Sequence, residues 1–261
     1  MVLLNYPRTG STWARGVLRR LHGVEHNALA RPLAGTRVGW RGFHELMLPI
    51  DRTATARRAQ RRSQHGCWRQ IPGWAADRQV VSVGRHPLAY LHSAFGHGFW
   101  RTHPAAPVDA IRARLPAFPD VDLAGYLDYL EQFALPDVLQ GAAPRAAVGP
   151  LTAHFLRFFH PRPQLALEGL TDAQLDGDDL VKDLPAVRFL RTERLRDDLA
   201  ALLTDQGYPA AAVHDAMEAS DRNASAPPPG DRRAPPLDRI ERFLDRERLL
   251  TRLFPLLPGA G

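Results

Sequence analysis

The chain has almost no cysteine and almost no lysine. Cys67 is the single cysteine among 261 residues, so no disulfide can form within the chain and no metal site can be built from several cysteines. Lys182 is the single lysine, and arginine therefore carries nearly all of the positive charge. An arginine-, alanine- and proline-rich composition indicates a GC-rich coding bias, so basicity alone does not establish a nucleic-acid partner.

Long apolar runs are also absent. No stretch approaches the roughly 18 apolar residues expected of a membrane-spanning helix, and no charged segment followed by an apolar run marks a secretory signal. The first apolar run starts at Val2, which leaves no room for a targeting peptide. We therefore expect a soluble protein of the bacterial cytoplasm, with no membrane partner.

Composition and length favour one globular domain. Hydrophobic residues make up 44% of the chain and charged residues 24%, which is ordinary for a globular protein, and 261 residues can bury a substantial core. The Pro-, Gly- and Arg-rich stretch Ser220–Pro236 is followed by too few residues to form a second domain. We expect a single domain over residues 1–261, whose net charge of +6 suits an anionic ligand or an acidic substrate.

Short apolar runs followed by helical patterns favour an α/β fold. Three runs are expected to be strands, namely Val2–Leu4, Gln79–Gly84 and Ala186–Arg191, and a further short strand is expected near Arg37–Gly42. Helical patterns are expected over 14–22, Asp51–Ser63, Pro87–Phe99, Val108–Leu115, Leu123–Phe133, Gly149–Phe159, Glu193–Gln206, Pro209–Ala219 and Leu237–Leu250, with a helical connection over 164–185. Such alternation indicates a parallel β-sheet that is flanked by helices on both faces.

The turn after the first strand has the layout of a phosphate-binding loop. Arg8 supplies a permanent cation, Gly10 allows close backbone approach, and Ser11 and Thr12 add hydroxyl groups where a helix begins at Trp13. The loop is not a Walker A motif, because that motif needs a second glycine followed by Lys and Ser or Thr. The alternative is a plain strand–turn–helix in which the hydroxyl residues only cap the helix.

A second arginine stands in the same local context. Arg85 directly follows the strand Gln79–Gly84 and precedes a helix that starts at Pro87, a residue suited to the first helical position. Ligands of parallel sheets bind at the carboxyl ends of the strands. Arg8 and Arg85 are therefore expected to meet at one sheet edge, where they could hold two phosphates.

These segments together resemble the sulfotransferases that use 3′-phosphoadenosine 5′-phosphosulfate. Tyr6–Trp13 is similar to the family's 5′-phosphosulfate loop, and Val83–Pro87 with Ser93 is similar to its 3′-phosphate site. Phe189–Leu195 resembles a late strand that leads into a helix, with Thr192 where many members carry an aromatic residue near the adenine. The resemblance implies a single-domain, P-loop-nucleotide-binding-like sulfotransferase fold.

The resemblance also implies a set of site residues. Cofactor binding is expected from Arg8, Thr9, Gly10, Ser11, Thr12, Trp13, Arg85, Ser93 and Thr192. The donor would be 3′-phosphoadenosine 5′-phosphosulfate, its product adenosine 3′,5′-bisphosphate, and no metal is expected. Asn223–Ser225 resembles a late Asn-x-Ser of some members, whereas the C-terminal Arg-Lys-Gly element of cytosolic members is missing and Arg232 and Arg233 occupy that region.

The chemistry suits these residue types. Transfer in line spreads charge over equatorial oxygens, so catalysis rests on positioning and charge stabilisation, and Arg8 is expected to stabilise the leaving phosphate oxygen. The acceptor, a small metabolite or glycan, would attack through a hydroxyl or, less favoured, an amine that needs a general base. His65, about twenty residues before Arg85, matches a family position, and a strand near Gln64–Trp68 would place it at the same sheet edge as Arg8 and Arg85. His44 beside Glu45 competes for the role, and Glu45 could replace it.

Two other classes of function stay open from the sequence. Another nucleotide-dependent transferase, such as a kinase, is disfavoured because the Walker lysine is missing. A basic nucleic-acid-binding protein is disfavoured because no reading motif or compact basic stripe with aromatic residues is present, so no nucleic-acid partner is expected. The sequence does not identify the acceptor. Its pocket could be lined by Trp40, Trp68, Trp74 and Trp100, although core positions are expected for most of them. The oligomeric state is not fixed either, and a homodimer is one candidate.

Overall fold

The chain folds around a five-stranded sheet. A computed structural model describes residues 1–21, 65–71, 73, 77–220 and 235–256, and the backbone of two further strands. The strands are β1 (Val2–Leu4), β2 (Thr36–Val38), β3 (His44–Leu46), β4 (Val80–Gly84) and β5 (Val187–Arg191). Those expected at the three apolar runs are confirmed. The strand expected near Arg37–Gly42 is shorter and starts earlier, and β3 was not expected.

The sheet is parallel except at one edge. Its strand order is β2-β3-β1-β4-β5, in which β1 pairs in parallel with β3 and β4, and β4 pairs in parallel with β5. Only β2 pairs antiparallel, with β3, so the expectation of a parallel sheet holds for the other four strands. The register sets Leu4 opposite Ser82 and Ser82 opposite Phe189, which brings the carboxyl ends of β1, β4 and β5 to one edge.

Helices account for most of the remaining described chain. Those before residue 140 are α1 (Ser11–Leu21), the 3₁₀ turn η2 (Trp68–Gln70), α3 (Pro87–His97), α4 (Phe99–Thr102), α5 (Val108–Arg112), α6 (Leu123–Tyr129), the π turn η4 (Leu130–Ala134) and α7 (Leu135–Leu139). Those after it are α8 (Pro150–Phe159), α9 (Pro163–Glu168), α10 (Asp172–Asp176), α11 (Asp179–Lys182), the 3₁₀ turn η5 (Thr192–Arg194), α12 (Leu195–Asp205), α13 (Ala210–Glu218), α14 (Leu237–Arg246) and α15 (Arg248–Leu253).

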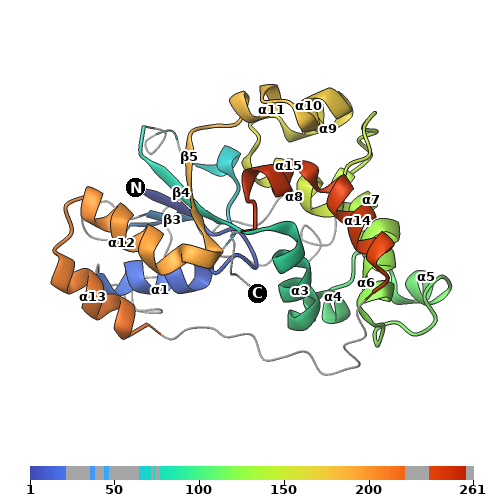
Figure 1. The fold of residues 1–261 in the computed structure, drawn as a ribbon, viewed down its shortest axis with the longest axis horizontal. Coiled ribbons are helices and arrows are strands. Elements are labelled where there is room, and N and C mark those ends of the chain that lie inside the picture. The colour runs from blue at the N-terminus through green and yellow to red at the C-terminus, as the bar shows by residue number, and fades with distance from the viewer. Residues whose placement is uncertain are drawn as a thin grey trace.

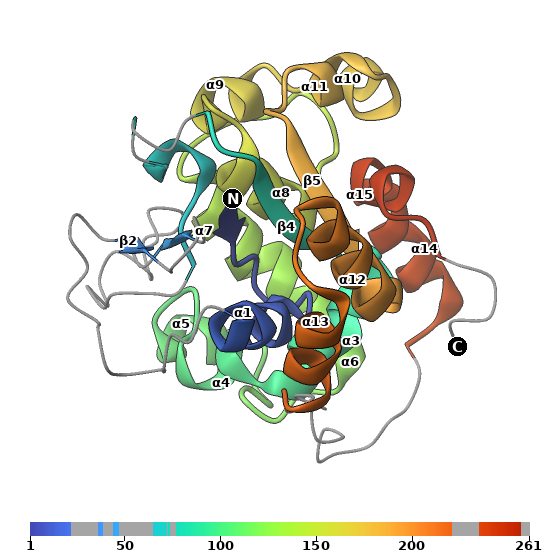
Figure 2. The same ribbon diagram turned by 90° about the vertical axis from the view of Figure 1, so that its left-hand side faces the viewer.

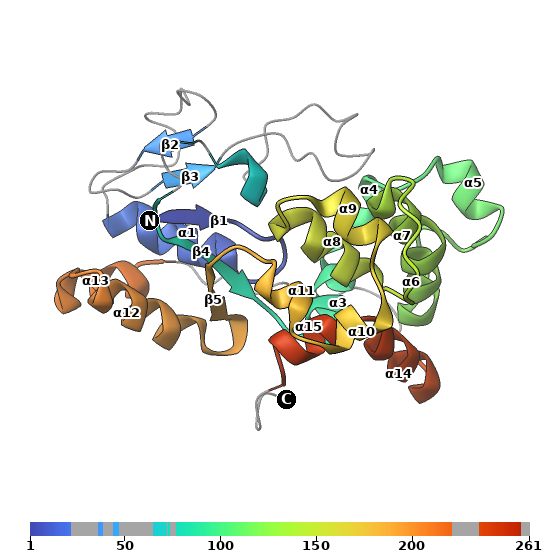
Figure 3. The same ribbon diagram turned by 90° about the horizontal axis from the view of Figure 1, so that it is seen from above.

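Both faces of the sheet are covered by buried apolar side chains. On one face, Leu3 of β1 and Val81 of β4 pack with residues of α1, α12 and α13. On the other face, Val2 and Leu4 of β1 pack with residues of α3, α6, α8 and α15. Figures 1 and 3 show these two groups of helices on opposite sides of the strands, and Figure 2 shows α13 beside α1 and α12. The structure is therefore an α/β fold with a largely parallel, two-sided sheet.

Two expected helices are each divided into two. The helix expected over Pro87–Phe99 ends at His97, because Gly98 adopts a left-handed conformation (φ 67°) and α4 starts behind it. The helix expected over Leu237–Leu250 breaks at Glu247, between α14 and α15. The Glu247 carboxylate accepts hydrogen bonds from the first amides of α8, so a contact distant in sequence causes this break.

The strand order reverses direction beside β1. The chain passes from β1 to β3 on one side of it, and then returns to β4 on the other side. In open α/β sheets such a reversal opens a crevice outside the carboxyl ends of the two central strands, where ligands bind. The loop after β1 carries Arg8 and the residue after β4 is Arg85, so the topology brings both to this edge of the sheet.

Candidate active site

The loop between β1 and α1 is built by its own hydroxyl groups. Thr9 Oγ1 and Ser11 Oγ both donate to the carbonyl oxygen of Tyr6, at 2.8 and 2.6 Å, and both residues are buried. Arg8 (φ 62°) and Gly10 (φ 84°) adopt left-handed conformations, which turn the chain sharply before α1. Thr9 and Ser11 therefore brace the loop here, whereas the sequence had suggested that the Ser11 hydroxyl would face an anion.

The start of α1 supplies amide groups to the same loop. The amides of Trp13 and Ala14 donate to the carbonyl of Gly10, at 3.0 and 3.4 Å, and the amides before them precede the first helical hydrogen bond. Thr12 is half-buried in this first turn. The loop thus offers backbone donors at a helix N-terminus, where the macrodipole favours negative charge.

The structure brings three of the expected residues together. Arg85 donates through Nη1 to the carbonyl oxygen of Arg8 at 3.0 Å. Arg8 in turn donates through Nη2 to the carbonyl oxygen of Ser93 at 3.2 Å and to its hydroxyl at 3.3 Å. Ser93 lies on α3, the helix that follows Arg85, so two strand–helix junctions meet at this point.

Both guanidinium groups are partly removed from water. Burial lowers the pKa of Arg8, and the nearby charge of Arg85 lowers it further. Burial likewise lowers the pKa of Arg85, while the charge of Glu193 opposes that shift. Within the described part of the chain, Arg85 Nε is buried and has no hydrogen-bond partner. Two partly desolvated cations at one sheet edge favour the binding of a ligand that carries more than one negative charge.

Thr192 and Trp13 complete the expected cofactor-binding set. The Thr192 hydroxyl lies 2.6 Å from the carbonyl oxygen of Thr9 and 2.9 Å from that of Gly84, so it reaches both loops. Trp13 is half-buried on α1, and its indole nitrogen has no hydrogen-bond partner among the described residues. Thr192 therefore contacts the backbone of the loop between β1 and α1, a role that its resemblance to an adenine-side aromatic position did not suggest.

His65 lies beside the end of β1. Its Nδ1 is 2.6 Å from the carbonyl oxygen of Asn5, the residue that follows the strand. A carbonyl oxygen can only accept, so Nδ1 carries a proton, and in the neutral ring the lone pair is on Nε2. Residues 65–67 are irregular chain before η2 and do not form the strand that the sequence suggested. The ring still lies at the expected edge, with its orientation set by a backbone acceptor.

His44 occupies a different position in the sheet. The register pairs Glu45 with Leu3 and His44 with Val2, and Val2 is three residues before Asn5 along the chain. At about 3.3 Å per residue, the His44 backbone is thus roughly 10 Å from the level of Asn5. The side chains of His44 and Glu45 lie outside the described residues, so their roles stay predictions.

Other expected features also fall outside the described residues. They are the arginine-rich helix Asp51–Ser63, the Asn223–Ser225 segment, Arg232, Arg233 and two tryptophans that could line an acceptor pocket, Trp40 and Trp74. Trp100, a third candidate, is buried against Phe118, Tyr126 and Tyr129. It therefore belongs to the core.

Three residues near the site were missed from the sequence. Tyr6 stacks on His154 of α8 with ring centroids 5.3 Å apart, and the Tyr6 hydroxyl is 3.2 Å from His154 Nδ1. Asn5 is 1% exposed, and neither polar atom of its side chain has a partner in the part of the chain that the structure describes. Asn5 precedes the Tyr6–Trp13 motif and Tyr6 begins it, so their position was a usable signal. Nothing local distinguishes His154.

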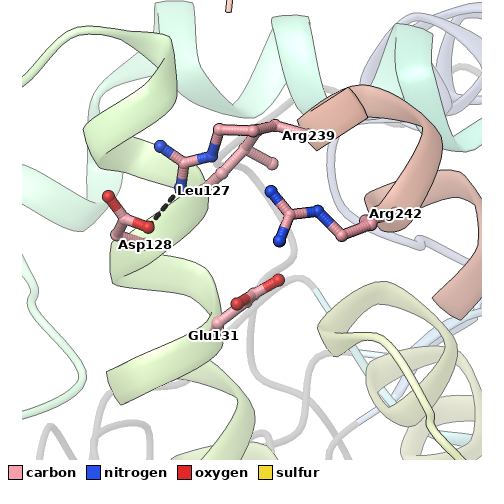
Figure 4. Close-up of a pocket in the computed structure, with 5 residues that line it drawn as sticks. All are labelled: Leu127, Asp128, Glu131, Arg239 and Arg242. Carbon is pink, nitrogen blue, oxygen red and sulfur yellow. Dashed lines mark hydrogen bonds and ion pairs between the residues drawn. The ribbon is translucent and has the colours of Figure 1, made fainter. Parts of the chain in front are cut away.

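A hollow of about 370 Å³ lies elsewhere, between α6, η4 and α14 (Figure 4). Its charged lining residues pair with carboxylates or arginines of the chain itself: Arg239 with Asp128, Arg242 with Asp238, and Glu131 with Arg246. None of the expected site residues lines it. Its charges are already balanced, so the arginines at the carboxyl ends of β1 and β4 are the better candidates for binding an anion.

Searches for metal sites and for relatives give no further assignment. No group of three or more His, Cys, Asp or Glu side chains is arranged to hold a metal ion within the described ranges. Over the same ranges, no helix has the length and apolar character needed to cross a membrane. Comparisons with protein-family models, with curated proteins and with solved structures find no match for this chain.

Proposed function

We propose that the chain transfers a sulfuryl group from 3′-phosphoadenosine 5′-phosphosulfate to a hydroxyl, or less favourably an amine, of a small metabolite or glycan. The observation that carries this proposal is the meeting of Arg8, Arg85 and Ser93 at the carboxyl ends of β1 and β4. Two arginines from separate strand–helix junctions suit a nucleotide with phosphate groups at both ends of its ribose.

Each of the two arginines would bind a different phosphate group of the ligand. The loop of Arg8, with the amides at the start of α1, suits the 5′-phosphosulfate, which carries the group to be transferred. Arg85 and Ser93 suit the 3′-phosphate. Arg8 donates to Ser93, so the two proposed phosphate sites are linked by a hydrogen bond.

Each step of the reaction would use a residue of the described site. The acceptor oxygen attacks sulfur while the bond from sulfur to the bridging phosphate oxygen breaks, and the bisphosphate leaves with that oxygen. Arg8 and the loop amides stabilise the negative charge that grows on the leaving group. His65 Nε2 takes the acceptor proton, since Nδ1 is committed to the Asn5 carbonyl.

Nucleotide binding provides the first test. We expect adenosine 3′,5′-bisphosphate to bind in calorimetry and to raise the melting temperature more than ATP does. Arg85→Ala should weaken binding by about thirtyfold or more, because loss of one partner of a desolvated charge pair costs about 2–5 kcal/mol. Ser93→Ala should weaken it less, by about 1 kcal/mol.

Arg188 provides a matched control. It lies on β5 opposite Val81, away from the carboxyl edge, and pairs with Asp205 at 3.0 Å. Arg188→Ala removes the same charge and should leave bisphosphate affinity unchanged. An unchanged affinity in Arg85→Ala would contradict the 3′-phosphate site. An acceptor screen with labelled sulfuryl donor then tests the transfer itself.

A further inference from the structure

The side chain of Thr192 joins three segments that end at the same sheet edge. Its hydroxyl oxygen lies 2.6 Å from the carbonyl oxygen of Thr9 and 2.9 Å from that of Gly84. Thr9 belongs to the loop after β1, Gly84 ends β4, and Thr192 directly follows β5. A threonine hydroxyl has one proton, so that proton is shared between the two carbonyls and ties the three segments together.

The surroundings hold Thr192 in this place. The amide of Arg191 donates to an oxygen of Asp198 on α12 at 2.8 Å, which anchors the end of β5. A Cβ at Gly10 would lie 2.9 Å from Leu195 Cδ2 and 3.8 Å from the Thr192 methyl group. The phosphate loop therefore rests directly on Thr192 and on the start of α12.

The two carbonyls belong to immediate neighbours of the two arginines. Thr9 follows Arg8, and Gly84 precedes Arg85. The bond from Arg85 Nη1 to the Arg8 carbonyl, at 3.0 Å, adds a second link between the same loops. These bonds are made within the protein itself and set the separation of the arginines, which reduces the ordering penalty on association.

We propose that Thr192 is a positioning residue that fixes the distance between the two phosphate-binding arginines, and so makes the site selective for a nucleotide with phosphates at both ribose ends. This inference rests on the proposed function. A bisphosphate must reach both arginines at once and depends on their separation. A nucleotide with a single phosphate group engages one arginine and does not depend on it.

Substitution at Thr192 tests this role. Thr192→Val keeps the branched shape and removes the hydroxyl, whereas Thr192→Ser keeps the hydroxyl. In calorimetry, the valine variant should bind adenosine 3′,5′-bisphosphate about tenfold more weakly, and adenosine 5′-monophosphate with less than about threefold change. The serine variant should recover bisphosphate affinity. Thr204→Val, at an exposed position of α12, is the matched control and should change neither affinity.

Hydrogen exchange of the ligand-free protein supplies a second measurement. Thr192→Val should speed amide exchange in both loops, residues 9–12 and 85–88, while the core strands stay protected. If Thr192→Val weakens the binding of both nucleotides equally, or leaves the bisphosphate affinity unchanged, the role of Thr192 is overturned but the proposed function is not. If the unaltered protein binds no bisphosphate, the proposed function fails and the selectivity with it, whereas hydrogen exchange still decides whether Thr192 couples the loops.

Discussion

Arg8 combines an unusual backbone conformation with a guanidinium that is hydrogen-bonded to Ser93. Its φ of 62° lies in the left-handed region, which costs a residue with a side chain about 1–3 kcal/mol and persists only where surrounding contacts hold it. Here Arg85 bonds to its carbonyl oxygen and Ser93 accepts from its guanidinium. The strained backbone therefore lies at the residue that we assign to the leaving group. The hydrogen bonds to Ser93 hold its guanidinium in place for the reaction.

Replacement of Arg8 should affect the transition state more than nucleotide binding. Arg8→Ala is expected to lower kcat by about 10²–10³-fold at saturating donor, as for loss of one preorganised donor to a developing oxyanion. Arg8→Lys should keep more activity, because the charge remains although the planar fork is lost. Steady-state kinetics of sulfuryl transfer measures both. Normal turnover of the alanine variant at saturating donor would refute the leaving-group role.

We propose His65 as the residue that takes the acceptor proton. Its Nδ1 bonds to the Asn5 carbonyl, which leaves Nε2 as the basic nitrogen of the neutral ring. His65→Ala should reduce transfer by about 10²–10⁴-fold and leave bisphosphate affinity unchanged, because a general base acts only in the chemical step. Single-turnover rates and calorimetry on the same variant separate the two effects.

Two further histidines complete that experiment. His214 is exposed on α13, so His214→Ala is a control that should leave the rate unchanged. His44→Ala is expected to raise mainly the acceptor KM, since the β3 register holds its backbone at the level of Val2. A large loss of rate in His44→Ala with a normal His65→Ala would assign the base to His44.

At the scale of elements, local patterns predicted the strands that position the site. Val2–Leu4 and the apolar run that ends at Gly84 are buried on both faces, so their hydrophobicity was sufficient to identify them. Arg8 and Arg85 followed from those strands, because Arg8 lies in the loop after β1 and Arg85 directly follows β4. The strand β3 was missed because His44–Leu46 is short and polar, and it exists through pairing with β1 and β2.

Contacts between distant segments could not be predicted in this way. Thr192 reaches carbonyls 183 and 108 residues earlier, and His154 meets Tyr6 148 residues earlier. Such contacts depend on strand order and helix packing, and no local periodicity encodes them. The same reason explains the break at Glu247. The helical pattern of Leu237–Leu250 continues through this residue, but the carboxylate turns away to another helix.

At the scale of the whole molecule, Glu247 connects the C-terminal helices to the core. It is fully buried, and it accepts from the amides of Leu151 and Thr152 at 2.8 and 2.6 Å and from the Thr152 hydroxyl at 2.7 Å. Gly149, which precedes α8, provides the space for this carboxylate, because a Cβ there would lie 2.2 Å from Glu247 Oε1. Glu247 thus caps α8 from a segment almost 100 residues later.

Burial makes this cap sensitive to pH. Desolvation raises the pKa of Glu247 to about 7, against the opposing effect of its hydrogen bonds from Thr152 and Leu151. The folded state therefore retains a proton that the unfolded chain releases above about pH 4.5. Its contribution to stability is fully present below that value and is lost as the pH rises through about 7. Burial lowers the pKa values of His86, His92 and His160. Their pH dependence is opposite to that of Glu247, because they destabilise the folded state as the pH falls.

A comparison of variants isolates Glu247 from these histidines. Between pH 5 and pH 8, the free energy of unfolding of the unaltered protein relative to Glu247→Gln should fall by on the order of 2 kcal/mol, because only the unaltered protein must bury a carboxylate at high pH. Urea unfolding at several pH values measures this difference. Glu241→Gln, at an exposed position of α14, removes the same charge and should give a difference that does not vary with pH. A pH-independent difference for Glu247→Gln as well would mean that Glu247 is ionised throughout, with three hydrogen bonds and the α8 dipole outweighing its burial.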